Sequence, residues 1–447
     1  MDEFSEQEVN KKKEESSEDG DYRNFTKLST KEVLDKTGFG FGSQQFINIL
    51  FLLTGASFFL IGIVNGLKVI VGNLVYYFIE RSKFVIDKRI ISLSGIVFGF
   101  SFLLIAIAIF IKSIALFAFA IIISNISIVL YGESKKFFKL SSSKAFLTEK
   151  IIKYSLIITA ISLFIAAYLM DAFPISGAPV LLNIFNNLFS LRIYGYLIVF
   201  EIAAISFIAA GYILSHVKNK SNQLKKQGNL KDETSDIHKE YLSGPLQLKD
   251  NFNFFIKNKI LLLLIITNIV VSLVQIIGYS YFGIFIYQNF NNVMFGGFLN
   301  VAMVFLISVF SSLIGYFITK INARAYRKFP ILIFGIIMIA FMPFIYYFKP
   351  DLIFVTIGTI IGVIGGSTVG VTNSLLAIEL INYNLRQAYF SFTNLLSVPF
   401  FLVFAPILAY IAQAYGLSVL FLSLTAILVV LIIMLLTVSV IFKKELV

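Results

Sequence analysis

The sequence has no cysteine and no tryptophan, and charged residues make up only 14% of its 447 residues. Without cysteine, the chain has no disulfide framework, thiolate nucleophile, zinc ribbon or iron–sulfur ligand set. An ordinary soluble domain contains about 25% charged residues, so the low value argues against a series of soluble domains. Because tryptophan is absent, tyrosine must supply any polar-tipped aromatic belt at a membrane interface.

Long apolar runs dominate the chain instead, and hydrophobic residues make up 58% of it. Runs of about 20 apolar residues are the mark of membrane-spanning helices. The first two runs are short, and we expect a turn between them near Asn65-Gly66. Twelve spans can be read from the sequence, with approximate limits 45–63, 66–80, 90–111, 114–132, 151–170, 193–215, 258–286, 293–318, 330–347, 352–378, 388–411 and 417–442.

The basic residues predict the orientation of the chain. If the N-terminus lies inside and the chain crosses twelve times, 33 of the 37 Lys and Arg residues fall in inside segments. Short basic loops stay on the cytoplasmic side, so both termini should be cytoplasmic in a multi-pass protein of the cell membrane. The basic residues are spread over these loops rather than gathered on one soluble face. The net charge of +12 therefore does not indicate nucleic-acid binding.

Polar segments divide the chain. Residues 1–43 hold eleven Asp or Glu against seven Lys or Arg, and we expect a disordered, cytoplasmic tail there. The glycine-rich run 38–42 follows no predicted strand, which disfavours a nucleotide-binding loop and favours a flexible link into the membrane. The further divisions expected are a six-helix bundle at 44–216, a cytoplasmic linker at 217–257, a second six-helix bundle at 258–442 and a cytoplasmic tail at 443–447.

Equal halves joined by a long loop suggest a duplicated bundle, and internal repeats are typical of secondary transporters. The two halves carry similar features at matching places. After the second span come Gly72 and a basic loop that begins with Arg81. After the eighth come Gly315 and a basic loop with Arg324 and Arg327.

In these features the sequence resembles the major facilitator superfamily. Gly315, Arg324 and Arg327 match the glycine and two basic positions of that family's loop motif, whereas Thr319 or Lys320 stands at its acidic position. The resemblance covers residues 44–442 in architecture and identifies no subfamily. It implies an all-α membrane protein in which twelve transmembrane helices form two six-helix bundles with pseudo-two-fold symmetry. It also implies transport by alternating access.

The basic loops have two interpretations that the sequence leaves open. They can serve topology alone, as every membrane protein requires. They can also form a latch of ion pairs and helix-end contacts that holds the halves together in the outward-facing state. The predicted latch residues are Gly72, Arg81, Gly315, Arg324 and Arg327.

A polar stripe marks the seventh span. Asn268, Ser272, Gln275 and Tyr279 are separated by four, three and four residues, so they share one helix face. Amides are costly in hydrocarbon, so this face should point inward. It predicts a substrate-binding wall, which the resemblance supports because the family's seventh helix commonly lines the cavity. Hydrogen bonds between helices are the alternative. Asn394 in the eleventh span is a further candidate for substrate binding.

Glu201 lies about eight residues, or roughly 12 Å, into the sixth span. A carboxylate at that depth is costly unless it is paired, protonated or faces a cavity. It is our candidate for proton coupling, and a structural acid bonded to neighbouring helix hydroxyls is the alternative. Lys68, close to the expected turn, should extend its charge to the interface rather than bind a solute.

Several chemistries can be discounted. Both histidines, His216 and His238, fall in the central loop, so no metal site is expected. No phosphate-binding loop with its lysine is found, no cofactor is implied, and no soluble domain is large enough for an enzyme. We therefore expect a monomeric secondary transporter in the lipid bilayer that moves a small organic solute, with proton coupling through Glu201 as a hypothesis. The alternative is a membrane scaffold or lipid-handling protein on a transporter-like fold.

Overall fold

A computed structural model describes residues 24, 26–81, 88–132, 134, 145–184, 187–217, 254–322, 328–348, 351–381 and 385–441. Within these residues, ten helices are long and apolar enough to cross a membrane. Six of these helices lie in the second half and four in the first. A broken first helix and α7 (Ala145–Ala172) bring the first half to six spans as well. The predicted number of twelve spans is confirmed, whereas the limits predicted for the first two spans are wrong.

The first half begins with a helix over residues 26–41, which continues after a break as α2 (Gln44–Leu53). The remaining spans of this half are α3 (Phe58–Arg81), α4 (Lys88–Phe110), α5 (Ile114–Gly132), α7 and α8 (Gly195–Ser215). The second half consists of α12 (Lys259–Asn289), α13 (Gly297–Asn322), α14 (Lys328–Phe348), α15 (Leu352–Leu380), α16 (Arg386–Tyr415) and α17 (Leu417–Ile441).

The first turn lies about ten residues earlier than the sequence predicted. Residues 54–57 separate α2 from α3, and Gly55 adopts a φ of 107°, a left-handed conformation that favours glycine. The turn expected at Asn65-Gly66 is therefore wrong, since both residues lie inside α3. Gly66 serves helix packing instead, because a Cβ added there would lie 2.7 Å from the Cβ of Ala405 on α16.

The boundary expected at residue 44 also differs from the structure. Residues 26–41 are helical and pack within the first half, and the glycines of run 38–42 allow close approach rather than flexibility. A Cβ added to Gly38 would lie 2.6 Å from the Phe207 ring of α8, and one on Gly42 would overlap the Phe102 ring of α4. The disorder predicted for residues 1–43 is therefore wrong for residues 26–41, and residues 1–23 and 25 lie outside the described residues.

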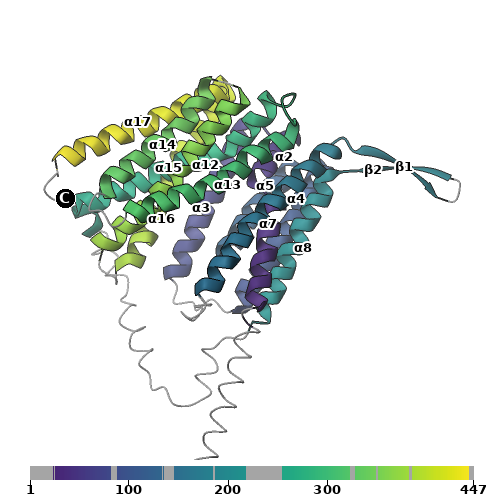
Figure 1. Ribbon diagram of the computed structural model, residues 1–447, viewed down its shortest axis with the longest axis horizontal. Coiled ribbons are helices and arrows are strands. Elements are labelled where there is room, and N and C mark those ends of the chain that lie inside the picture. Colours follow the sequence, from purple (N-terminus) through teal and green to yellow (C-terminus); the bar gives the residue numbers. More distant parts are fainter. Residues whose placement is uncertain are drawn as a thin grey trace, which may run out of the picture.

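A β-hairpin between α7 and α8 is an addition to the all-α fold that we expected. Strands β1 (Ala178–Ile184) and β2 (Asn187–Ile193) pair antiparallel, with partners running from Ala178 and Ile193 to Ile184 and Asn187. The hairpin projects from the bundle beside α7 and α8 (Figure 1). Its side of the bundle, with the turns at 54–57, 111–113 and 290–296, is called the hairpin side below, and the opposite side the far side.

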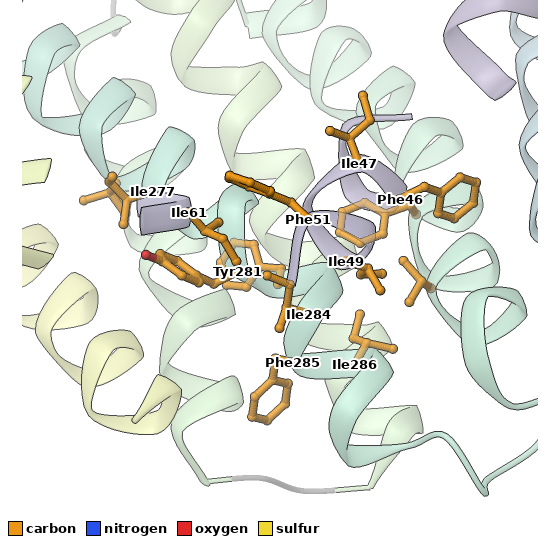
Figure 2. Close-up of a cluster of buried hydrophobic side chains, with 14 of the residues drawn as sticks. Phe46, Ile47, Ile49, Phe51, Ile61, Ile277, Tyr281, Ile284, Phe285 and Ile286 are labelled. Carbon is orange, nitrogen blue, oxygen red and sulfur yellow. The ribbon is translucent and has the colours of Figure 1, made fainter. Parts of the chain in front are cut away.

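One apolar core runs through both halves. Figure 2 shows buried side chains of α2, α3 and α12 gathered in it. Phe46 and Phe51 come from α2 and Ile61 from α3, while Tyr281 and Phe285 come from α12 of the other half. All five are buried, so on this side the halves share a core rather than a solvated seam.

Candidate functional site

The two halves meet chiefly along four pairs of helices. Helix α3 packs on α16 and on α12, α2 packs on α12, and α7 packs on α13. A glycine brings α3 and α16 close together, because a Cβ added to Gly62 would lie 2.5 Å from the Cβ of Ala409. Small residues allow helix backbones to approach in this way within a membrane.

Hydrogen bonds cross between the halves in the hairpin-side part of the spans. The Tyr281 hydroxyl of α12 donates to the carbonyl of Phe58 at the start of α3, at 2.7 Å. The backbone N–H of Gly283 donates to Oε1 of Gln45 on α2, at 3.1 Å. Each bond joins a side chain to backbone of the opposite half, so the contact is specific as well as apolar.

Asp171 makes the strongest of these cross-half contacts. It lies in the last turn of α7, and its two carboxylate oxygens accept the N–H groups of Phe298 and Leu299 at 2.9 and 2.8 Å. Those N–H groups belong to the first turn of α13, where a helix has no internal acceptors for them. The helix dipole also favours a carboxylate at this position. Asp171 thus caps a helix of the other half.

A further cross-half bond lies nearer the middle of the spans. The side-chain amide of Asn73 on α3 donates to Oγ of Ser397 on α16, at 2.6 Å. Ser397 in turn donates to the backbone carbonyl of Asn394, at 2.6 Å. Asn394 is half-buried and lies one turn from this link, but no contact described in the structure joins its side chain to the stripe of α12.

The polar stripe of α12 lies on one partly exposed face. Asn268, Ser272, Gln275 and Tyr279 are all half-buried, whereas most of their neighbours along the helix are buried. Helix α12 contacts α2, α3, α13, α15, α16 and α17, so other helices surround it. A partly exposed polar face on an enclosed helix points to the interior of the bundle.

Two residues of the stripe have defined neighbours. The side-chain amide of Gln275 lies against Gly366 of α15, where an added Cβ would come within 2.7 Å of Nε2. The Tyr279 ring lies 6.5 Å from the ring of Phe305 on α13, measured between centroids. The stripe therefore faces α13 and α15 of its own half, and Gly366 makes room for an amide.

Glu201 is not part of this region. It is exposed on α8, on the same face as Ile205 and Tyr212, which are 66% and 61% exposed. The opposite face of α8, with Phe200 and Phe207, is buried. The interior position that we expected is corrected here, because depth along a helix does not set the direction of a side chain. The structure does not test proton coupling through Glu201, but the exposed position of the side chain argues against it.

The predicted latch is only partly described. Gly72 and Gly315 occupy matching positions, since a Cβ on Gly72 would lie 2.5 Å from the Asn125 amide of α5 and one on Gly315 would overlap Ser367 of α15. The pairs α3–α5 and α13–α15 correspond between the halves, which is the repeat that the sequence indicated. The side chain of Arg81, together with Arg324 and Arg327, lies outside the described residues. The latch therefore stays a prediction.

Sequence reasoning missed a polar cluster in the first half. Lys68 of α3 donates to the side-chain carbonyl of Gln44 on α2, and Gln44 is bonded to Asn48 and Asn65. The error followed from the misplaced turn. With the turn at 54–57, Lys68 lies ten residues into α3 and not near its end, so the position expected for an interfacial lysine is wrong.

The sequence matches no family model and no curated protein. Its structure is similar to those of membrane transporters over nearly its whole length. The nucleoside transporter NupG matches with a TM-score of 0.65 and 13% identity, covering 92% of this chain and 98% of that one. The tetrameric protein PepTSo2 matches with a TM-score of 0.62 and 12% identity, covering 96% of this chain and 100% of that one. The human organic anion transporter MFSD10 matches with 0.54 and 11%, covering 93% and 99%. The chain therefore has the fold of the major facilitator superfamily.

Proposed function

We propose that the protein is a secondary transporter that moves a small organic solute across a cell membrane by alternating access. The partly exposed polar stripe of α12 carries the proposal. A scaffold has no use for amides and a phenol on the interior face of an enclosed helix, whereas a solute path needs such donors and acceptors. The fold supports transport rather than enzyme chemistry.

The conformation fits a state that is closed on one side. The cross-half bonds of Asp171, Tyr281 and Gln45 lie in the hairpin-side part of the spans. From the distribution of basic residues, the hairpin side is extracellular and both termini are cytoplasmic. On this orientation the structure is that of a state closed to the outside. Rocking of the two halves about the central stripe would open the hairpin side and close the far side.

The cargo class follows from the site and not from the fold. The structural neighbours carry nucleosides and organic anions by name, so the fold alone does not choose between them. Asn268, Ser272 and Gln275 offer hydrogen bonds without charge. A solute with several polar groups fits this wall, and the lipid bilayer is the remaining partner that we propose.

The test is a thermal-shift screen of the purified protein followed by flux into liposomes. Any compound that binds only the folded protein raises its melting temperature. We expect hits and flux that Gln275→Ala abolishes, because Gln275 lies on the stripe. Ser423→Ala is the control and should leave both unchanged, because Ser423 is a half-buried residue of α17 whose hydroxyl bonds the Val419 carbonyl of its own helix. A folded protein without hits or flux would favour the scaffold or lipid-handling alternative.

A further inference from the structure

Lys68 is a cation placed deep within a membrane span. It lies ten residues from Phe58 and thirteen from Arg81, the two ends of α3. Ten residues of helix correspond to about 15 Å, close to the middle of a bilayer core. Lys68 is half-buried there, so part of its side chain is accessible. A charge at this depth is costly and commonly marks a functional site.

The neighbours of Lys68 form a directed chain of hydrogen bonds. An ammonium group can only donate, so its bond to Gln44 identifies that side-chain atom as the carbonyl oxygen, Oε1. Nε2 of Gln44 must then donate, and it does so to Oδ1 of Asn48 and Oδ1 of Asn65, at 3.1 and 3.2 Å. Asn65 donates to Oδ1 of Asn48, at 3.1 Å. The lysine thus fixes the orientation of all three amides.

Some N–H groups of this cluster, on Asn48 and Lys68, have no acceptor among the described residues. Nδ2 of Asn48 has no partner among the described residues, although Asn48 is only 1% exposed. Lys68 uses one of its three N–H groups, and no carboxylate of the described residues lies within ion-pair distance of it. A buried donor without an acceptor is rare in native proteins and calls for an explanation.

The cluster also lies beside the interface between the halves. Gln44 directly precedes Gln45, whose side chain accepts the Gly283 N–H of α12. The polar cluster of the first half and the polar stripe of the second half therefore lie on helices that touch.

We propose that Lys68, Gln44, Asn48 and Asn65 form the subsite that binds the carboxylate of a singly charged organic solute. A carboxylate has only acceptors, so it satisfies the free N–H groups of Lys68 and Asn48 and balances the single positive charge. The inference deepens the proposed transport function and rests on it. The proposed solute then carries a carboxylate in addition to the neutral polar groups that the stripe of α12 binds.

The first test needs no known ligand. The chain lacks cysteine, so Ser43→Cys creates a single thiol beside Gln44 at a half-buried position where Ser43 makes no capping hydrogen bond. The thiol is treated with an anionic methanethiosulfonate, carrying a sulfonate, and with a cationic one, carrying trimethylammonium. The ratio of the two rates cancels any change in the thiol itself. We expect Lys68→Met to lower the anion-to-cation ratio at least fivefold, because the nearby charge attracts one reagent and repels the other.

Two variants control for net charge and for folding. Lys68→Arg keeps the charge and should keep the ratio. Lys112→Met removes one positive charge from an exposed turn on the hairpin side and should not change it. A ratio that is the same with and without the Lys68 charge overturns the inference, because the cation would then not face the accessible space.

The second test names the ligand class. Carboxylates are paired with their neutral amides, namely benzoate with benzamide, nicotinate with nicotinamide, and indole-3-acetate with its amide. We expect a carboxylate to stabilise the wild-type protein more than its amide, with affinity at least tenfold weaker in Lys68→Met. Equal binding of acid and amide, or no binding of any carboxylate, contradicts the assignment.

The outcomes separate this inference from the proposed function. Flux of a solute that is unaffected by Lys68→Met, together with no charge selectivity at Ser43→Cys, leaves the transporter and removes the anion subsite. Charge selectivity without flux of any solute leaves the anion subsite and contradicts transport.

Discussion

Asp171 should hold the two halves together on the hairpin side. Its replacement should therefore shift the equilibrium from the hairpin-side-closed toward the hairpin-side-open conformation. The carboxylate joins the end of α7 to the first turn of α13, so both of its hydrogen bonds break when the halves part. Gly297 shows how close the contact is, because a Cβ added to it would overlap the Asp171 carboxylate. The bonds therefore stabilise only the state in which the hairpin side is closed.

The size of the effect can be worked out from these two bonds. A hydrogen bond to a charged group contributes about 1.5–3 kcal/mol. When the halves part, water replaces much of that, and a partly buried carboxylate at a helix N-terminus contributes up to about 2 kcal/mol net. We take about 2 kcal/mol for the pair, which is roughly a 30-fold change in the equilibrium constant. A hairpin-side-open state present in about one molecule in a hundred would then rise to about one in four.

The assay uses the cysteine-free sequence. Ile111→Cys and Phe348→Cys place spin labels at exposed positions on the hairpin side, one in each half. Distances between the labels, measured by pulsed electron paramagnetic resonance, report the two states as separate populations. Asp171→Asn should increase the population with the longer distance between the labels. The amide keeps one acceptor for one of the two backbone N–H groups, but it turns its own N–H toward the other.

The matched control is Asp351→Asn. Asp351 caps α15 by accepting the N–H of Phe354 at 3.0 Å, but both residues belong to the same half. Its replacement should lower the melting temperature without changing the distances. The opposite result is that Asp171→Asn, like Asp351→Asn, lowers the stability and leaves the distance populations unchanged. That result would refute the claim that Asp171 stabilises the hairpin-side-closed state.

Three further predictions follow from the same contacts. Tyr281→Phe removes one cross-half hydrogen bond of about 1 kcal/mol, so the same distance measurement should show roughly a fivefold shift toward the hairpin-side-open state, and no shift would mean that the bond persists in both states. Gly62→Ala should destabilise the protein by about 1–3 kcal/mol in thermal unfolding because its Cβ meets Ala409, whereas Gly370→Ala, with nothing within 4 Å, should not. Glu201→Gln should leave flux and its pH dependence unchanged because the side chain is on an exposed face, and a changed pH profile would restore it as the proton-coupling acid.

The sequence by itself predicted the number of spans and the polar stripe, and the proposed orientation rests on it as well. Apolar length and the distribution of basic residues depend only on the order of residues along the chain, since a bilayer has a fixed thickness and short basic loops stay on one side. The stripe of Asn268, Ser272, Gln275 and Tyr279 follows in the same way from the period of a single helix.

Only the tertiary structure decided where a helix ends and which way a lone side chain points. Gly55 and Gly66 look alike in sequence, yet one occupies a left-handed turn and the other packs inside a helix against Ala405. That difference moved Lys68 from an expected interface to the middle of α3. Glu201 and Lys68 are both single charges within spans, and only their neighbours distinguish them. One lies on an exposed face of α8, and the other is bonded into amides that α2 supplies, because the direction of a side chain is set by the helices that pack around it.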